Sequence, residues 1–485
     1  MAKQPSDRRW RRHHRNDCPR SPWATARITF RRKFTYDATD QLSFYANGGY
    51  YNRGLERPVE REDITGGSKY NTTYEGYNWG AGAKYKLSKR NVIQFDYSGN
   101  NYASRYKYLI ENSGYLPGQY ALTKLQKFHD AELKGIFGFT TNSTTVFGVD
   151  YRREVLRRPD SDLDKSVYTT SAYGQHEVKL WNHLTGVVGV RYDHHEQTGG
   201  RFTPKVAAMY NIGNFNVRAT YAAGFRAPGI DELYYHMFKK TMGTRATISL
   251  GDENLDPEHS NYYSINMEYR TNRFSASVTG YLNYVKNMVT SKSTKFDDLP
   301  EAEQNQLREE FPEIGDLSST KNLSVKNYFN FEKATVKGFE VNLNGNLFPG
   351  FTLAGNYTYA YGRGLNEGGE WQNIERSIRH TATITGNYTH SWSDYTLNLN
   401  LNGRLQSKVY YPGDADGNAP GYGIWNLNTR HTFDGFRNFV IEPGIGIDNI
   451  FNKKDNRPLN KNFALVFSGT FGSNQPGTQT KIISP

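Results

Sequence analysis

Three neighbouring side chains near the middle of the chain have the chemistry to bind iron. Tyr234, Tyr235 and His236 follow one another directly in the sequence. Imidazole nitrogens and phenolate oxygens are both ligands of iron in proteins. We therefore take His236, Tyr234 and Tyr235 as candidate ligand-binding residues. A histidine in a long connection can also be simply exposed to solvent, and the residues alone leave both interpretations open.

The side-chain sets that would indicate catalysis are missing from the sequence. It contains no G-x-S-x-G segment, no H-E-x-x-H segment and no G-x-x-x-x-G-K-[ST] segment. Cys18 is the single cysteine, so neither a disulfide framework nor a cysteine metal site can form within the chain. We predict that the protein is not an enzyme and that it has no resident cofactor.

An acidic stretch at residues 297–316 is the strongest local charge feature outside the N-terminus. Its carboxylates are Asp297, Asp298, Glu301, Glu303, Glu309, Glu310, Glu313 and Asp316. Leu299, Leu307 and Phe311 could form a weak apolar stripe on a short helix. The stretch is either a solvated excursion of a long connection or a site for a cation or a basic partner.

The elements that must position these residues are strands. In residues 395–405, Leu397, Leu399 and Leu401 alternate with Asn398, Asn400 and Asn402. Such alternation gives a strand one apolar and one polar face. About nineteen segments between residues 24 and 471 read as strands. Short turns and long connections alternate between them, and this pattern is typical of a barrel whose two rims face different compartments.

Composition supports a barrel that crosses a membrane with strands. Only 36% of the residues are hydrophobic, and no apolar run reaches the roughly 18 residues that a spanning helix needs. Aromatic residues make up 14% of the chain, with 36 Tyr and 27 Phe, which suits aromatic girdles at the membrane interfaces. We predict an all-β fold, a transmembrane antiparallel β-barrel surrounded by membrane lipid. The alternative is a tyrosine-rich soluble β-protein.

The chain divides into three regions. Residues 1–23 are basic throughout and lack the apolar core of a secretory signal peptide, so we expect them to be disordered or foreign to the fold. Residues 24–471 form the barrel, and residues 472–485 form a C-terminal tail. The net charge is +12, but no nucleic-acid motif follows the basic segment, and we expect no nucleic-acid partner.

Several motifs resemble those of one family, the TonB-dependent outer-membrane receptors. Phe225, Arg226, Ala227 and Pro228, followed by Glu232, Leu233 and Tyr234, resemble its F-R-A-P-x-x-x-E-L-Y motif. Residues 251–258, with Asn254, Leu255, Pro257 and Glu258, are similar to its N-P-N-L-x-P-E segment. Residues 334–340 resemble its late-barrel strand, residues 447–453 its N-L-F-x-K segment, and residues 462–471 its final strand.

The resemblance implies energised uptake of a scarce nutrient across the outer membrane of a Gram-negative bacterium. The implied ligand is an iron complex, either haem or a ferric siderophore, and His236 occupies the interval in which haem receptors of this family place an iron ligand. A cobalamin receptor and a passive porin-like channel are the alternatives. The implied partner is the TonB complex, and we expect a monomer.

The resemblance also implies parts that lie outside this chain. The family encloses a plug domain in a barrel of about 22 strands. Counting strands on either side of residues 225–259, we expect the plug, its TonB box and about three barrel strands to be absent from this chain.

Overall fold

The computed structural model describes residues 25–56, 69–111, 114–240, 246–365, 369–410, 418–435, 439–453, 464–473 and 479–480. The predicted N-terminal segment 1–23 lies outside the described residues, as does most of the predicted tail 472–485. The final long strand ends at Ser473 rather than at residue 471.

One sheet organises the chain, and all its ladders are antiparallel except that between β12 and β15. In the described residues it contains 23 strands, four of which (β11, β12, β17 and β25) are short additions at its margins. The other 19 are β1 (Thr25–Asp37), β2 (Leu42–Leu55), β3 (Tyr70–Lys86), β4 (Asn91–Tyr108), β5 (Tyr120–Thr140), β6 (Ser143–Arg158), β7 (Leu163–Leu180), β8 (Leu184–His195), β9 (Gly199–Ile212), β10 (Phe215–Arg226), β13 (Glu258–Arg270), β14 (Phe274–Lys295), β15 (Leu323–Phe348), β16 (Phe351–Leu365), β18 (His380–Ser391), β19 (Tyr395–Gln406), β22 (Tyr422–Phe433), β23 (Phe439–Asp448) and β24 (Ala464–Ser473).

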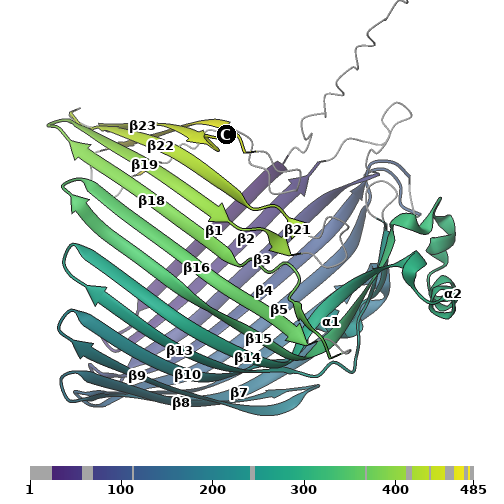
Figure 1. The fold of residues 1–485 in the computed structure, drawn as a ribbon, viewed down its shortest axis with the longest axis horizontal. Coiled ribbons are helices and arrows are strands. Elements are labelled where there is room, and N and C mark those ends of the chain that lie inside the picture. The colour runs from purple at the N-terminus through teal and green to yellow at the C-terminus, as the bar shows by residue number, and fades with distance from the viewer. Residues whose placement is uncertain are drawn as a thin grey trace, which may run out of the picture.

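These 19 strands pair with their neighbours in chain order and curl into a barrel wall (Figure 1). The predicted number of about nineteen strands is therefore confirmed, and the first and last of them lie close to the predicted limits of residues 24 and 471. Within the described ranges, no ladder joins β1 to β24.

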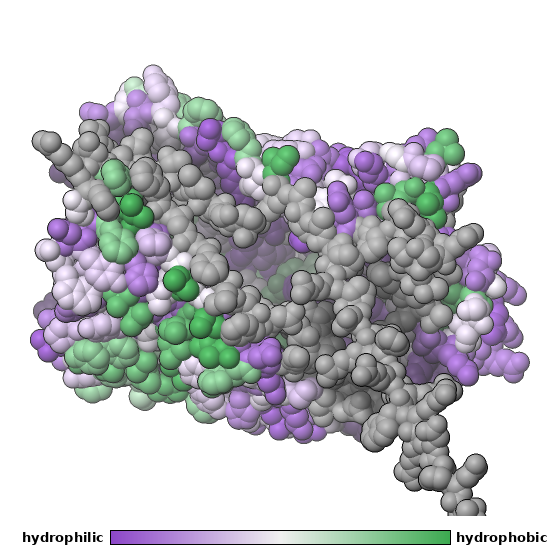
Figure 2. All heavy atoms as spheres, turned by 90° about the horizontal axis from the view of Figure 1, so that it is seen from above, coloured by the Kyte–Doolittle hydropathy of each residue, from purple (hydrophilic) through white to green (hydrophobic). Residues whose placement is uncertain are grey.

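The two faces of the wall differ in polarity. In β8, Val188 and Val190 are largely exposed on one face, whereas Arg191 and Asp193 lie on the other and form ion pairs or hydrogen bonds. Because large exposed apolar side chains recur on the first face of most strands, that face suits lipid and we call it the outward face. Figure 2 shows hydrophobic residues gathered on one flank and a hollow in the middle of the view.

The connections differ in length at the two rims. Tight turns such as residues 213–214 and 349–350 close the short-turn rim, and most connections at the other rim, the long-loop rim, are long, including 227–257 and 296–322. Two connections at this rim, 159–162 and 196–198, depart from the predicted alternation because they are short. The β6–β7 ladder continues to Arg158 and Leu163, and the β8–β9 ladder continues to His195 and Gly199, so paired strand takes the place of a long loop.

Part of the long-loop rim forms a small subdomain with its own core. Strands β11 (His236–Lys240) and β12 (Ala246–Leu250) form a hairpin, and β12 pairs in parallel with residues 323–327 of β15. Helix α2 (Glu301–Glu310) covers one face of this sheet and projects beyond the barrel wall (Figure 1). We call residues 236–240, 246–250 and 296–327 the rim subdomain.

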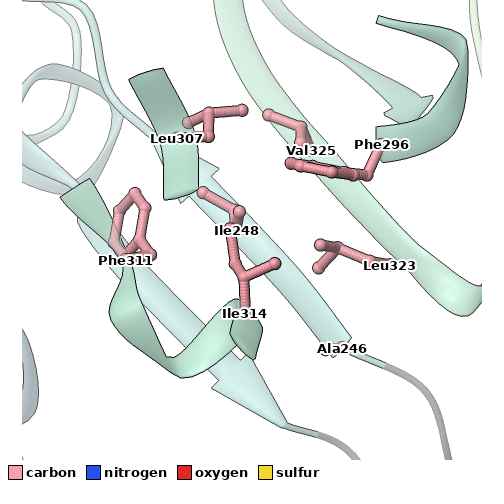
Figure 3. Packing of buried hydrophobic residues seen from close by; sticks show 8 residues of the cluster. All are labelled: Ala246, Ile248, Phe296, Leu307, Phe311, Ile314, Leu323 and Val325. Carbon is pink, nitrogen blue, oxygen red and sulfur yellow. The ribbon is translucent and has the colours of Figure 1, made fainter. Parts of the chain in front are cut away.

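The core of the rim subdomain is fully apolar. Its buried side chains converge from β12, from β15 and from α2 with the segments on either side of it (Figure 3): Ala246, Ile248, Phe296, Leu307, Phe311, Ile314, Leu323 and Val325. The predicted stripe of Leu299, Leu307 and Phe311 faces this core, which confirms a short helix in the acidic stretch. The acidic stretch as a cation or basic-partner site stays a prediction.

The remaining elements are short. They are α1 (Ile230–Tyr234), the 3-10 helices η1 (Pro159–Ser161), η2 (Phe296–Asp298), η3 (Pro312–Asp316) and η4 (Thr320–Asn322), and the strands β17 (Trp371–Asn373), β20 (Val409–Tyr410), β21 (Asn418–Ala419) and β25 (Gln479–Thr480). Among the described residues, no helix has the length and apolarity needed to cross a membrane.

Candidate ligand-binding site at the long-loop rim

Arg226 ties together three segments at the mouth of the barrel. Its guanidinium binds Glu232 through two hydrogen bonds of 2.9 and 3.2 Å and Glu258 through one of 2.8 Å. Glu232 also accepts a 2.7 Å hydrogen bond from the backbone N–H of Gly229, and Glu258 accepts one of 2.9 Å from the N–H of Val289. The planar guanidinium can serve both carboxylates at once. The end of β10, helix α1 and the start of β13 are thereby held in one arrangement.

Helix α1 is anchored in the mouth of the barrel by apolar contacts. Ile230 packs in a buried cluster with Leu156, Leu163 and Val167 of β6 and β7. Leu233 packs with Leu255 and Val289 in a second cluster. Gly251 lies so close to α1 that a Cβ there would come within 2.6 Å of the Leu233 backbone, so only glycine permits this approach.

The other residues of the predicted family motifs make packing contacts and local hydrogen bonds. Phe225 stacks on His259 with ring centroids 5.8 Å apart, and Pro228 is buried while Ala227 and Pro257 are half-buried. Asn254 is exposed and donates from its side chain to Asp252 at 3.1 Å. These contacts explain the motif as a device that folds residues 225–259 into the barrel mouth.

Tyr234 and Tyr235 lie beside cationic side chains of neighbouring strands. The Lys165 ammonium lies 4.6 Å from the centre of the Tyr234 ring, and the Tyr234 hydroxyl accepts a hydrogen bond from Gln197. Arg158 lies 5.2 Å from the Tyr235 ring centre and donates to the Tyr235 hydroxyl at 3.2 Å. Register places Arg158 and Lys165 on the inward face of β6 and β7.

A third pair of the same kind comes from β15. The Lys326 ammonium lies 4.5 Å from the Tyr328 ring and donates to its hydroxyl at 2.9 Å. Tyr328 and Tyr234 pack against the same buried cluster around Leu233. We call Arg158, Lys165, Lys326, Tyr234, Tyr235 and Tyr328 the cation–tyrosine cluster. Within the described ranges, neither Lys165 nor Lys326 has a carboxylate at ion-pair distance.

The two predicted tyrosines are held as neutral phenols. Burial, the largest cause, raises the pKa of Tyr235, and burial followed by the nearby charge of Glu253 raises the pKa of Tyr234. Their hydroxyls take part in hydrogen bonds with Gln197 and Arg158, and their rings contact Lys165 and Arg158.

The His236 side chain is exposed, and its contacts are with the rim subdomain. Its ring stacks on Phe311 with centroids 4.5 Å apart, and its Nε2 lies 3.3 Å from Glu310. The three predicted site residues are thus not brought together around one point. Among the described residues, no three His, Cys, Asp or Glu side chains group as a metal site. His236 as a ligand of haem iron stays a prediction, and it would require Nε2 to leave Glu310.

A cavity of about 430 Å³ lies directly beneath the 224–230 segment. Its inward wall carries Arg191, which binds Asp150 at 2.9 Å and Asp193 at 2.8 Å. Unlike the lysines of the cation–tyrosine cluster, this arginine is neutralised by carboxylates. The unneutralised charge of the site therefore lies above the cavity, at the rim.

No sequence motif indicated Arg158, Lys165, Lys326 or Tyr328. Lys326 and Tyr328 are two residues apart on one strand and share a face, so their pairing could have been predicted. Lys165 and Arg158 meet Tyr234 and Tyr235 only through the tertiary fold, and the sequence offers no local signal for those contacts.

The curled 19-strand wall, with its outward apolar face and its loops folded into one mouth, defines a β-barrel of the receptor type. The family model described as "TonB dependent receptor-like, beta-barrel" matches residues 7–450. The chain belongs to this family, whose members are transport receptors of the outer membrane rather than enzymes.

Individual relatives share about a quarter of their aligned residues with this chain. The "Ferric enterobactin receptor PirA" of Pseudomonas aeruginosa is 24% identical over 312 residues, covering 60% of this chain and 37% of that protein. The "Vitamin B12 transporter BtuB" of Vibrio cholerae is 25% identical over 182 residues, covering 36% of this chain and 27% of that protein. The chain therefore spans less than half the length of these relatives.

Among solved structures, the siderophore receptor PirA from Pseudomonas aeruginosa is similar with a TM-score of 0.61 and 18% identity, covering 93% of this chain and 77% of that one. At this identity the likeness shows the fold alone. Together with the family match, it confirms the predicted transmembrane β-barrel class.

Proposed function

We propose that this chain is the barrel of a receptor that takes up an anionic ferric siderophore, with aromatic chelating groups, across the outer membrane. The cation–tyrosine cluster carries this proposal. It places three cations and three phenol rings at the mouth of the barrel, where an incoming ligand arrives first. The membership of the chain in the receptor family supports transport as the activity, with the TonB complex as the partner.

The chemistry of a catecholate chelate matches the cluster. Its catecholate oxygens fill the coordination positions of the iron, so the protein need not supply a ligand atom. The chelate is negatively charged and presents aromatic rings, which the cations and the tyrosines can contact. In the described part of the chain, Lys165 and Lys326 contact tyrosines and have no carboxylate at ion-pair distance, so their charges are available to an anionic ligand.

A siderophore accounts for the geometry better than haem does. The His236 side chain, which the family resemblance implies as a haem ligand, contacts Phe311 and Glu310 instead. The relatives named as ferric enterobactin receptors point the same way. Another relative is named as a vitamin B12 transporter, and the binding test below distinguishes vitamin B12 from a ferric siderophore as the ligand.

Ligand binding by the purified chain in detergent tests the proposal. The probe is ferric enterobactin, followed by quenching of intrinsic fluorescence. Because two unpaired cations are lost, we expect the Lys165→Gln/Lys326→Gln variant to bind at least about tenfold more weakly. Lys292→Gln, which removes an exposed positive charge on the outward side of β14, is the matched control and should bind as the wild type does.

Two other ligands complete the test. Cyanocobalamin binding without ferric enterobactin binding would contradict the proposal in favour of a cobalamin receptor. Haemin binding with a Soret shift that disappears in His236→Ala would contradict it in favour of haem and would support His236 as the iron ligand. Equal affinity of the wild type and the double lysine variant for ferric enterobactin would remove the cation–tyrosine cluster from the site.

A further inference from the structure

A groove runs across the outward face of five neighbouring strands. It has a volume of about 880 Å³ and is lined by β9, β10, β13, β14 and β15, with Tyr359 of β16 at one end. Its floor follows one row of directly paired residues, in which Ala208 faces Ala219, Ile265 faces Gly280, and Gly280 faces Phe339. Ala208, Ala219 and Gly280 are small, so the row is low at these positions, on either side of the exposed Ile265.

Larger side chains form the wall of the groove on its long-loop side. The next paired row contains Val206, Tyr221, Tyr263, Leu282 and Lys337. Tyr263 and Val206 are among the large apolar residues exposed on the outward face of the barrel. The groove is therefore apolar along its length and ends at a single cation, Lys337.

Lys337 also lines a second, smaller cavity of about 220 Å³. There it lies with Arg363, Tyr361 and Trp371 on the outward face of β15 and β16 and of β17. Arg379 lies 4.7 Å from the Tyr361 ring centre, and Lys337 lies 6.0 Å from it. We call Lys337, Arg363 and Arg379 the cationic patch. In the described ranges, none of these three side chains has a carboxylate at ion-pair distance.

Cations on the lipid-facing side of a barrel are costly unless they lie near the headgroups, where they attract anionic lipid. The cationic patch lies on the long-loop side of the groove, and long loops of such barrels face the outside, so we place the patch toward the headgroups of the outer leaflet. A ligand that filled both features would need an apolar chain joined to more than one negative charge. A lipid fits because the groove opens directly onto the bilayer side of the wall.

We propose that this surface binds a multi-acylated, phosphorylated glycolipid of the outer leaflet. One acyl chain lies in the groove over Ala219 and Gly280, and phosphate groups bind the cationic patch. Tyr361 and Trp371 beside the patch offer flat rings to the sugars. This site is separate from the cation–tyrosine cluster, because it is on the outward face of the wall.

The test measures lipid binding to the purified full chain in detergent by native mass spectrometry. The probe is hexa-acylated, bis-phosphorylated lipid A, with phosphatidylglycerol as the competing lipid. We expect lipid A to bind about tenfold more weakly to Lys337→Gln/Arg363→Gln. We expect a similar loss for Gly280→Leu, because the space around Gly280 is open and a leucine would occupy the groove without changing the charge.

Lys89→Gln, in a turn at the short-turn rim, is the matched charge control and should bind lipid A as the wild type does. Unaltered ferric enterobactin binding by the variants would show that the barrel is intact and that the two sites are independent. The proposal is overturned if phosphatidylglycerol binds as tightly as lipid A, or if Gly280→Leu retains full lipid A binding.

Discussion

At the scale of single residues, Arg226 shows how one side chain can organise the mouth of the barrel. Its guanidinium reaches Glu232 and Glu258, which come from different elements. A lysine has one ammonium and cannot keep the paired geometry toward both carboxylates. We expect Arg226→Lys to weaken the docking of α1 by about 1–3 kcal/mol. Hydrogen exchange of residues 230–235 should be correspondingly faster, while exchange in β8 stays unchanged.

Arg152→Lys provides the comparison, because Arg152 makes a single 3.1 Å contact with Asp130 and a lysine can replace it. Equal protection of residues 230–235 in Arg226→Lys and in the wild type would show that the apolar contacts of Ile230 and Leu233 hold α1 without the ion pairs.

Helix α2 raises a pH-dependent prediction at the scale of elements. A hydrogen bond from Gln306, followed by the contact with His236, lowers the pKa of Glu310. A carboxyl group whose pKa is lowered by folding stabilises the fold above its unfolded pKa, about 4.3, and loses that effect as the pH falls through the folded value. We expect α2 to undock from β11 more often below about pH 4.

Hydrogen exchange of residues 301–310, corrected for the intrinsic effect of pH, measures this undocking. Glu310→Gln should remove most of the added pH dependence, whereas Glu309→Gln, an exposed neighbour, should leave it in place. Identical pH profiles for these two variants would show that protonation of Glu310 does not cause the undocking.

Single strands could be predicted from the sequence, but contacts between distant elements could not. Strands such as β19 were predictable because apolar and polar residues alternate along each one. Leu401, for example, is exposed on one face, and its neighbour Asn402 forms a side-chain hydrogen bond on the other. The rim subdomain was only partly predictable. The parallel pairing of Ile248 with Val325 joins residues far apart in the chain, so no local pattern indicates that the stripe of Leu307 and Phe311 has a partner.

At the scale of the whole molecule, the barrel wall separates the two proposed binding sites. The inward face and its folded loops carry cations next to tyrosines, and the outward face carries small residues that lead to a cationic patch. Alternation along each strand could be predicted from sequence, but the rows across strands could not, because they depend on the register of every ladder. Ala219 and Gly280 become one groove floor only through Ile265 between them.

The same ladders make the whole wall sensitive to close contacts between strands, and Gly338 is the clearest case. A Cβ at Gly338 would lie 1.9 Å from the carbonyl oxygen of Tyr359 and 2.8 Å from the hydroxyl of Tyr281. Because β15 and β16 are paired on both sides of this point, the strands cannot separate locally. We expect Gly338→Ala to destabilise the barrel by about 1–3 kcal/mol, measured as a lower urea midpoint for loss of β-sheet circular dichroism. Gly280→Ala meets nothing within 4 Å, so it should leave the midpoint unchanged or slightly raised. A midpoint for Gly338→Ala equal to that of Gly280→Ala would mean that the wall absorbs the added methyl group by shifting whole strands.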